Sequence, residues 1–311
     1  MNFISPIKLK PKGQTMYFTP ETLVFKDGEF LPVSGMDSIL FSQTLHYGYG
    51  LFEGMRSYQT PDGPKIFKAL EHFERMAQSA KKLKLPLPYS PRQLKAFSYQ
   101  LLKHNNLSDA YIRPLLYTAP NMSLQATREA HILIMAWKWG RLLGDNLVNL
   151  LISDFQRGSF PEKLTDTKVS GLYVNNIMAS SDARMKGFHD ALLLDQNGNV
   201  SQATGANIFM EIDEVLYTPP KGNIMPGITR TTVMELAKGM GIPVKEKNFT
   251  PEELYHADGA FLVGTATEIA GIATVNKNPF KMRWEDTTGF ILSRKYRQLV
   301  TGSERGGGTL I

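Results

Sequence analysis

Pro226-Gly227-Ile228-Thr229-Arg230 is the stretch of this sequence that says most about the fold. The Pro-Gly pair predicts a turn, and the residues that follow it, 231–238, carry apolar side chains at helical spacing. A helix that begins directly after a turn leaves its first backbone N–H groups without partners inside the helix, and such a start binds phosphate. The stretch therefore predicts an anion site at Ile228 and Thr229.

A second anion site is predicted at Gly264-Thr265-Ala266-Thr267-Glu268. The apolar run 259–263 predicts a buried strand, and the small residues after it offer open amides beside a hydroxyl group. Upstream of both sites lies Lys168, with Tyr173 five residues after it. Each feature alone also fits an ordinary turn or a surface lysine, so it is their combination that indicates a reactive amine beside an anion.

The composition sets limits on the class of protein. The chain has 311 residues, 42% of them hydrophobic and 21% charged, which is typical of a globular protein with two medium-sized domains. Lys and Arg outnumber Asp and Glu by 35 to 29, but they are spread along the chain, which suits an anionic small molecule better than a nucleic acid. Without cysteines or a long apolar stretch, we expect a cytoplasmic protein with no membrane partner.

The hydrophobic pattern divides the chain into two domains. In the first half we expect a hairpin around Asp27-Gly28, a strand at 55–58, helices at 70–83 and 91–102, and strands at 110–116 and 131–137. In the second half we expect a strand at 149–153, a helix at 173–186, hairpins at Asn197-Gly198 and Asp213-Glu214, and a capping box from Thr250. This predicts a small N-terminal α/β domain over residues 1–139, an interdomain loop at 140–147, a large C-terminal domain over 148–311, and a frayed tail at 302–308.

Several other functions are excluded by spacing. The glycines of Gly48-Tyr49-Gly50-Leu51-Phe52-Glu53-Gly54 are spaced one residue too widely for a dinucleotide-binding loop, and a strand pattern follows where a helix is required. The histidines do not show the helical spacing of zinc ligands, and there is no Gly-x-Ser-x-Gly nucleophile elbow. We therefore expect neither a Rossmann site nor a metal site.

Read together, the motifs resemble those of the class IV, or fold-type IV, pyridoxal-phosphate-dependent aminotransferases, and most of all the branched-chain amino-acid aminotransferases. The resemblance runs from about residue 23 to residue 290 and is carried by residues 47–56, 111–114, 168–173, 226–230 and 264–268. It implies an α/β fold with a small α/β domain and a larger pseudo-barrel domain. It also implies transfer of the amino group of leucine, isoleucine or valine to 2-oxoglutarate, giving the branched 2-oxo acid and L-glutamate.

The resemblance also implies a role for each residue that matches a motif. Lys168 would bind pyridoxal 5'-phosphate covalently and carry the proton in catalysis, and Tyr173 would bind the 3'-oxygen of the ring. Gln202 would face the ring nitrogen. The phosphate would be held by the side chain of Arg75, the amides of Ile228 and Thr229, and Thr265.

On the substrate side, the resemblance implies an apolar pocket formed by Tyr47, Phe52 and Gly54, with Tyr47 reaching the site of a neighbouring subunit in a homodimer or larger homo-oligomer. Tyr111 and the backbone at Thr265 and Ala266 would hold the α-carboxylate of the substrate. Arg113 would bind the second carboxylate of glutamate or 2-oxoglutarate, because one site must accept an apolar and an acidic side chain in turn.

Two residues depart from the family pattern. Gln202 stands where the family usually has a glutamate, and an amide cannot supply the negative charge that keeps the ring nitrogen protonated. Leu142 stands where many relatives have a pocket tyrosine. The alternatives are another enzyme of the same fold type, a D-amino-acid transaminase or an aminodeoxychorismate lyase, or, because of Gln202, a weakly active or non-catalytic protein that binds pyridoxal phosphate.

Overall fold

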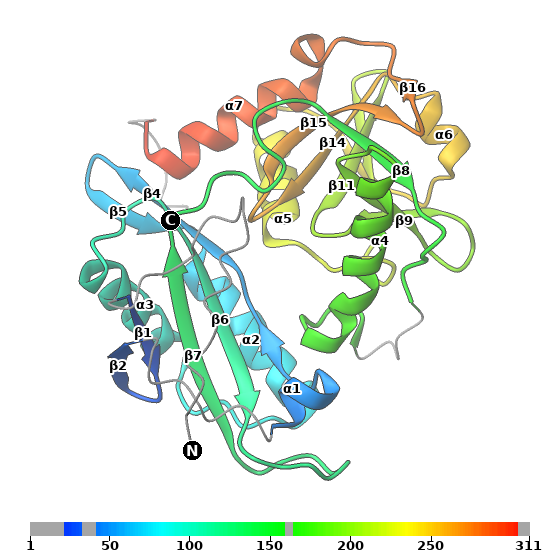
Figure 1. The fold of residues 1–311 in the computed structure, drawn as a ribbon. Coiled ribbons are helices and arrows are strands. Elements are labelled where there is room, and N and C mark those ends of the chain that lie inside the picture. The colour runs from blue at the N-terminus through cyan, green and yellow to red at the C-terminus, as the bar shows by residue number, and fades with distance from the viewer. Residues whose placement is uncertain (1–21, 33–41, 159–163, 304–311) are drawn as a thin grey trace, which may run out of the picture.

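The computed structural model describes residues 22–32, 42–158 and 164–303. Its strands form two sheets, one from each half of the chain, and helices pack on both (Figure 1). The predicted frayed tail lies outside the described residues from 304 onward.

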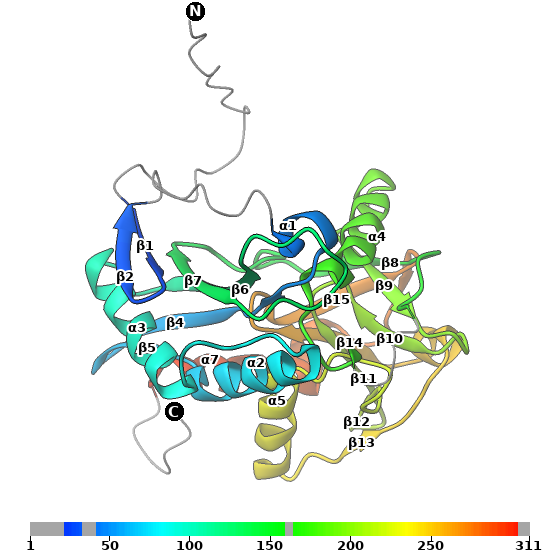
Figure 2. The same cartoon turned by 90° about the horizontal axis from the view of Figure 1, so that it is seen from below.

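The first sheet has seven strands in the described residues, and β6 and β7 are the longest of them. Its main path runs β2-β1-β7-β6-β4-β5, with β3 paired to β6. The strands are β1 (Leu23–Lys26), β2 (Glu29–Pro32), β3 (Leu51–Phe52), β4 (Met55–Thr60), β5 (Gly63–Ile66), β6 (Ala110–Thr118) and β7 (Ala130–Trp137). Helices α2 (Ala69–Leu83) and α3 (Pro91–His104) share one hydrophobic core with this sheet, while the short α1 (Gln43–Tyr47) lies beside its far end (Figure 2).

The second sheet closes on itself. Its path β10-β9-β8-β15-β14-β11 returns to β10 through an additional β10–β11 pairing, so six strands form a ring. They are β8 (Val148–Ile152), β9 (Asp190–Leu194), β10 (Val200–Ala203), β11 (Asn207–Ile212), β14 (Gly259–Gly264) and β15 (Glu268–Val275). Strands β12 (Val215–Thr218), β13 (Val244–Glu246) and β16 (Asn278–Pro279) extend the sheet beyond the ring. This confirms the predicted α/β fold with a barrel-like second half.

Helices cover the outside of the ring. Helix α4 (Tyr173–Met185) packs on β9, α5 (Ile228–Gly239) on β14, and α7 (Thr288–Thr301) on β15. Helix α7 also contacts β4 of the first sheet, and the short α6 (Pro251–Tyr255) buries Leu254 in the core of the ring. No helix in the described part of the chain is long and apolar enough to cross a membrane.

The local signals in the sequence placed these elements correctly. Asp27 has φ +49° and Gly28 has φ +103°, the positive values that a tight hairpin turn needs. Ser90 caps α3, and Thr250 caps α6, each with the predicted capping box. The interdomain loop predicted at residues 140–147 falls between β7 and β8. We keep this loop as our proposal for the domain boundary.

Candidate active site

A cavity lies between the two sheets, where the ends of several elements meet. It encloses about 580 Å³ including the space at its open mouth. Both halves of the chain contribute to its wall, and the polar side chains among the lining residues are Arg75, Tyr111, Lys168, Tyr173, Gln202, Thr204, Asn207, Thr229 and Thr265.

Lys168 and Tyr173 meet inside this cavity. The lysine Nζ donates a hydrogen bond to the Tyr173 hydroxyl at 2.7 Å. The Phe52 ring packs edge-on against the Tyr173 ring at 4.6 Å between centroids, and the Lys168 Nζ lies 5.0 Å from the centre of the Phe52 ring. The amine is therefore held between two aromatic rings, with a phenol as its hydrogen-bond partner.

The backbone around Lys168 is fixed by pairing with the segment before β4. The Phe52 N–H donates to the Lys168 carbonyl at 3.1 Å, and Leu51 forms a bridge with Val169. Further along, the N–H of Gly171 donates to the carbonyl of Gly48 at 3.0 Å. A Cβ on Gly48 would lie 2.4 Å from the Gly171 Cα, so the close approach of the two chains requires a glycine.

Helix α5 begins at Ile228, and its first two residues, Ile228 and Thr229, line the cavity. Its N-cap residue, Gly227, makes no side-chain hydrogen bond to cap the helix. A Cβ on Gly227 would lie 2.2 Å from Asn207 Oδ1, and the Asn207 amide donates to the Met225 carbonyl at 2.9 Å. Asn207 therefore shapes the turn, and the helix start keeps donors for an anion.

Arg75 reaches the same end of the cavity from α2. Its Nε and Nη2 donate to the two carboxylate oxygens of Glu53 at 2.7 and 2.8 Å, and its Nη1 donates to the Pro226 carbonyl at 3.1 Å. Glu53 also accepts from His72 Nδ1 at 2.8 Å. Burial acts to raise the pKa of Glu53, but the charge of Arg75 and these hydrogen bonds outweigh it and hold the pKa well below its usual range.

The side chain of Arg56 binds the backbone carbonyl groups of the turn after β14. The buried guanidinium donates to the carbonyls of Thr265 at 3.0 Å and Ala266 at 3.2 Å. It also donates to the carbonyls of Trp139, at 2.9 Å, and Gly140 in the segment between the two sheets. Because N–H and C=O point in opposite directions in a trans peptide, this arrangement turns the Ala266 N–H away from Arg56.

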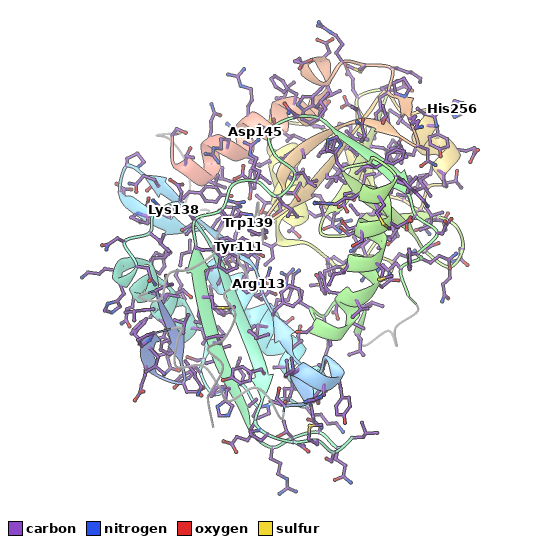
Figure 3. The ribbon with its side chains drawn as sticks, in the orientation of Figure 1. Tyr111, Arg113, Lys138, Trp139, Asp145 and His256 are labelled. Carbon is purple, nitrogen blue, oxygen red and sulfur yellow. The ribbon has the colours of Figure 1, made fainter. Side chains whose placement is uncertain are left out.

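Tyr111 enters the cavity from β6, opposite a glycine. A Cβ on Gly54 would lie 2.1 Å from the Tyr111 hydroxyl, so only glycine leaves room for this side chain. The hydroxyl accepts a hydrogen bond from Arg113 Nη2 at 3.0 Å, and the Arg113 guanidinium lies 4.7 Å from the centre of the Phe52 ring. Figure 3 shows Tyr111, Arg113 and Trp139 together in the space between the two halves of the molecule.

Gln202 lies in β10 and is nearly buried, with 5% of its surface exposed. Its Oε1 accepts the Met225 N–H at 2.7 Å, and its Nε2 lies 3.4 Å from the Ala203 carbonyl. Gln202 is among the residues that line the cavity, and the Met225 N–H fixes which end of its amide is the oxygen.

The structure brings most of the predicted site residues to one cavity. Ten of the thirteen line it: Gly54, Arg75, Tyr111, Lys168, Tyr173, Gln202, Ile228, Thr229, Thr265 and Ala266. Phe52 and Arg113 stand directly behind the wall, in contact with Tyr173 and Tyr111 respectively. Tyr47 is not part of the wall, because it is 49% exposed on α1 and donates to the Met122 carbonyl.

Thr204 and Asn207, which line the cavity, had no role in the sequence-based predictions, and neither had three buried charged residues near it, Glu53, Arg56 and Glu268. Glu53 and Arg56 lie within the motif at 47–56, but their partners are far away in the sequence. Glu268 is also buried and binds Arg141 of the connecting segment at 3.0 Å. The only signal for these three charged residues in the sequence was that they are charged and lie inside the motifs. A charge that becomes buried on folding needs a partner.

Comparison with known proteins agrees with this geometry. The family model of amino-transferase class IV matches residues 50–275. The branched-chain-amino-acid aminotransferase of Pseudomonas aeruginosa is 34% identical over 286 residues, which cover 90% of this chain and 93% of that protein. The Escherichia coli K12 enzyme of the same name is 34% identical over 261 residues, covering 81% and 84%.

Solved structures of branched-chain aminotransferases are similar as well. The Thermoproteus uzoniensis enzyme with norvaline superposes with a TM-score of 0.87 at 34% identity, covering 91% of this chain and 96% of that one. The Thermobaculum terrenum enzyme in its pyridoxal-phosphate form has a TM-score of 0.84 at 27% identity, covering 92% and 95%. Fold and site together define a pyridoxal-phosphate-dependent transaminase. The chain belongs to the class IV aminotransferase family.

The residues of the cavity fit this cofactor. A phosphate group needs N–H donors and positive charge, which the start of α5 and Arg75 provide at one end. The aldehyde needs an amine and the phenolic oxygen needs a donor, which Lys168 and Tyr173 provide 2.7 Å apart. Of the described residues that line the cavity, none is an aspartate or glutamate that would repel the phosphate.

Proposed function

We propose that this chain transfers the amino group of leucine, isoleucine or valine to 2-oxoglutarate. The named relatives, all branched-chain aminotransferases, support this substrate class. Bound pyridoxal phosphate supplies the electron sink for the reaction. In this proposal Lys168 holds the cofactor and moves the proton, Tyr173 binds the 3'-oxygen, and Arg75, Ile228, Thr229 and Thr265 hold the phosphate.

The observation that carries the substrate proposal is the pairing of Arg113 with Phe52. An apolar ring and a guanidinium group lie 4.7 Å apart directly behind the cavity wall, and the buried Arg113 Nε has no hydrogen-bond partner among the described residues. This pair suits a branched aliphatic side chain near the ring and a second carboxylate near the free N–H. Tyr111 and the backbone at Thr265 and Ala266 would hold the α-carboxylate in both half-reactions.

A steady-state assay tests this proposal. The purified protein is given a panel of L- and D-amino acids with 2-oxoglutarate, and we expect turnover with L-leucine, L-isoleucine and L-valine. Arg113→Met should raise the KM for 2-oxoglutarate about 10-fold or more, the loss of a hydrogen bond to a charged group, while the KM for leucine changes little. Preference for D-amino acids, or lyase activity on aminodeoxychorismate, would contradict the proposal, and no turnover at all would favour a non-catalytic role.

We also propose that the protein is a homo-oligomer, with at least two chains. Large apolar side chains are exposed on α1 and α4, which lie next to each other: Leu45, Tyr47, Val174, Ile177 and Met178. Large exposed apolar side chains that gather on neighbouring helices indicate a protein interface. Since Tyr47 lies outside the cavity of its own chain, a substrate role for it requires a second copy of this chain.

A cytoplasmic location remains a prediction from the cysteine-free sequence.

A further inference from the structure

We infer that Gln202 donates a hydrogen bond to the ring nitrogen of the cofactor, so that this protein holds the pyridine ring unprotonated. The inference deepens the proposed function and rests on its cofactor, not on the identity of the amino-acid substrate. It concerns the one position in the cofactor site where this chain departs from the family's glutamate.

The orientation of the Gln202 amide follows from its backbone neighbour. The atom 2.7 Å from the Met225 nitrogen must be an acceptor, because a backbone N–H can only donate. That atom is therefore Oε1, and the other half of the amide is the NH2 group. If the amide were flipped, its NH2 group would face the Met225 N–H, and two donors would oppose each other.

The NH2 group keeps at least one N–H for a ligand. Its protein contact, to the Ala203 carbonyl, is long at 3.4 Å and uses one of two hydrogens. The backbone of Gln202 is fixed because β10 pairs with β9 at Leu193 and with β11 at Asn207, and the Met225 N–H holds the side-chain oxygen. A buried N–H that lines a cavity needs an acceptor from the bound molecule.

The chemistry of pyridoxal phosphate supplies that acceptor. In the pyridine ring the nitrogen is opposite the carbon that carries the aldehyde, and therefore opposite the bond to Lys168. A pyridine nitrogen without a proton accepts a hydrogen bond, whereas a protonated one donates and would face a second donor. An amide is far too weak an acid to protonate the nitrogen, so the pairing with Gln202 favours the neutral ring.

Among the described residues of the wall, no aspartate or glutamate competes with Gln202 for this role. The ionisable side chains that line the cavity are Arg75, Tyr111, Lys168 and Tyr173. Behind the wall, Asp190 accepts hydrogen bonds from Thr204 at 2.7 Å and from the Ala191 N–H at 2.9 Å, and Glu53 is paired with Arg75 and His72. Neither carboxylate lines the cavity itself.

The test uses pyridoxal phosphate labelled with 15N at the ring nitrogen, bound to the parent and to Gln202→Glu without substrate. We expect the 15N chemical shift of an unprotonated pyridine in the parent at pH 7.5. In Gln202→Glu one carboxylate oxygen still accepts the Met225 N–H, and the other pairs with the ring, so the shift should move to that of a protonated pyridine. In Gln202→Leu, whose side chain can neither donate nor accept, the ring nitrogen should stay unprotonated but lose its hydrogen bond. Its 15N chemical shift should therefore differ less from the parent value than in Gln202→Glu.

The outcomes separate this inference from the proposed function. A protonated nitrogen in the fully loaded parent would overturn the inference alone. In that case Asp190→Asn would show whether a proton reaches the ring through Thr204. Failure of the parent to bind the cofactor at all would contradict the proposed function itself, and with it this inference.

Discussion

At the scale of single residues, the pair of Glu53 and Arg75 determines the charge at the end of the cavity where we propose that the phosphate binds. The carboxylate uses two oxygens to fix the plane of the guanidinium, which leaves an N–H of Nη1 for a ligand. The buried position makes both charges expensive to leave unpaired.

We predict that Arg75→Met weakens cofactor binding about 10- to 100-fold, since a hydrogen bond to a charged group is worth roughly 1.5–3 kcal/mol. The change also leaves Glu53 buried without its cation and should lower the free energy of unfolding by about 3–5 kcal/mol. The double variant Glu53→Gln/Arg75→Met should regain stability but not cofactor affinity. Titration with the cofactor measures the effect, and Arg92→Met, at an exposed position of α3, is the control. Unchanged affinity in Arg75→Met would show that Arg75 does not bind the phosphate.

The same cluster predicts how stability depends on pH. Burial lowers the pKa of His72, and the charges of Arg75 and Lys168 lower it further. Glu53 acts to raise this pKa but does not outweigh the burial. The unfolded chain therefore binds a proton at His72 below about pH 6.5 that the folded protein does not bind, and stability falls as the pH falls. The lowered pKa of Glu53 acts in the same direction below about pH 4.3.

We therefore expect the parent to lose up to about 1.4 kcal/mol of stability per pH unit below pH 6.5 because of His72. His72→Asn keeps a donor where Nδ1 lies but does not titrate. Its free energy of unfolding should therefore change less with pH between pH 6.5 and pH 5. Urea unfolding of both proteins across this range is the measurement. Equal slopes would mean that His72 is not held neutral.

At the scale of elements, Arg56 connects strand β4, the turn after β14 and the segment between the sheets. It contacts four backbone carbonyls, and so fixes the Thr265–Ala266 turn from the side opposite the Ala266 N–H. Arg56→Lys keeps the charge but cannot reach all four carbonyls. We predict that this variant raises the KM for leucine about 10-fold and changes kcat less, with near-normal cofactor affinity. A KM equal to that of the parent would contradict a positioning role for Arg56.

The elements also show what the sequence can predict and what it cannot. Turns, caps and helices were predictable because Asp27-Gly28, Ser90-Pro91 and Thr250-Pro251 act on neighbours within four residues. The role of Arg56 was not, because its partners at Thr265 and Ala266 are more than 200 residues away and are backbone atoms with no sequence signature. The amide orientation of Gln202 likewise depends on Met225, which only the fold brings near.

At the scale of the whole molecule, the closed ring could not be deduced from periodicity. It depends on the parallel pairing of β8 with β15, two strands more than 100 residues apart, and only the family resemblance implied it. The resemblance also led us to expect that the motif residues lie together, and ten of the thirteen predicted site residues do line one cavity.

The exposed apolar faces of α1 and α4 lead to a prediction about assembly. Sedimentation analysis should give a mass of at least two chains of 34.9 kDa. Ile177→Glu places a charge in the middle of the α4 face and should shift the protein toward single chains, whereas Ile291→Glu, at a similarly exposed position of α7, should not. A parent protein that sediments as one chain would contradict the proposed oligomer.

The most direct test of the whole account is to find where the cofactor is attached. The protein loaded with pyridoxal phosphate is reduced with borohydride, digested, and mapped by mass spectrometry. We predict one pyridoxyl group, on Lys168, because its Nζ is the amine that lines the cavity between Tyr173 and Phe52. Lys168→Ala should give no adduct and no turnover. A pyridoxyl group on a different lysine, or no adduct with the cofactor in excess, would contradict the account.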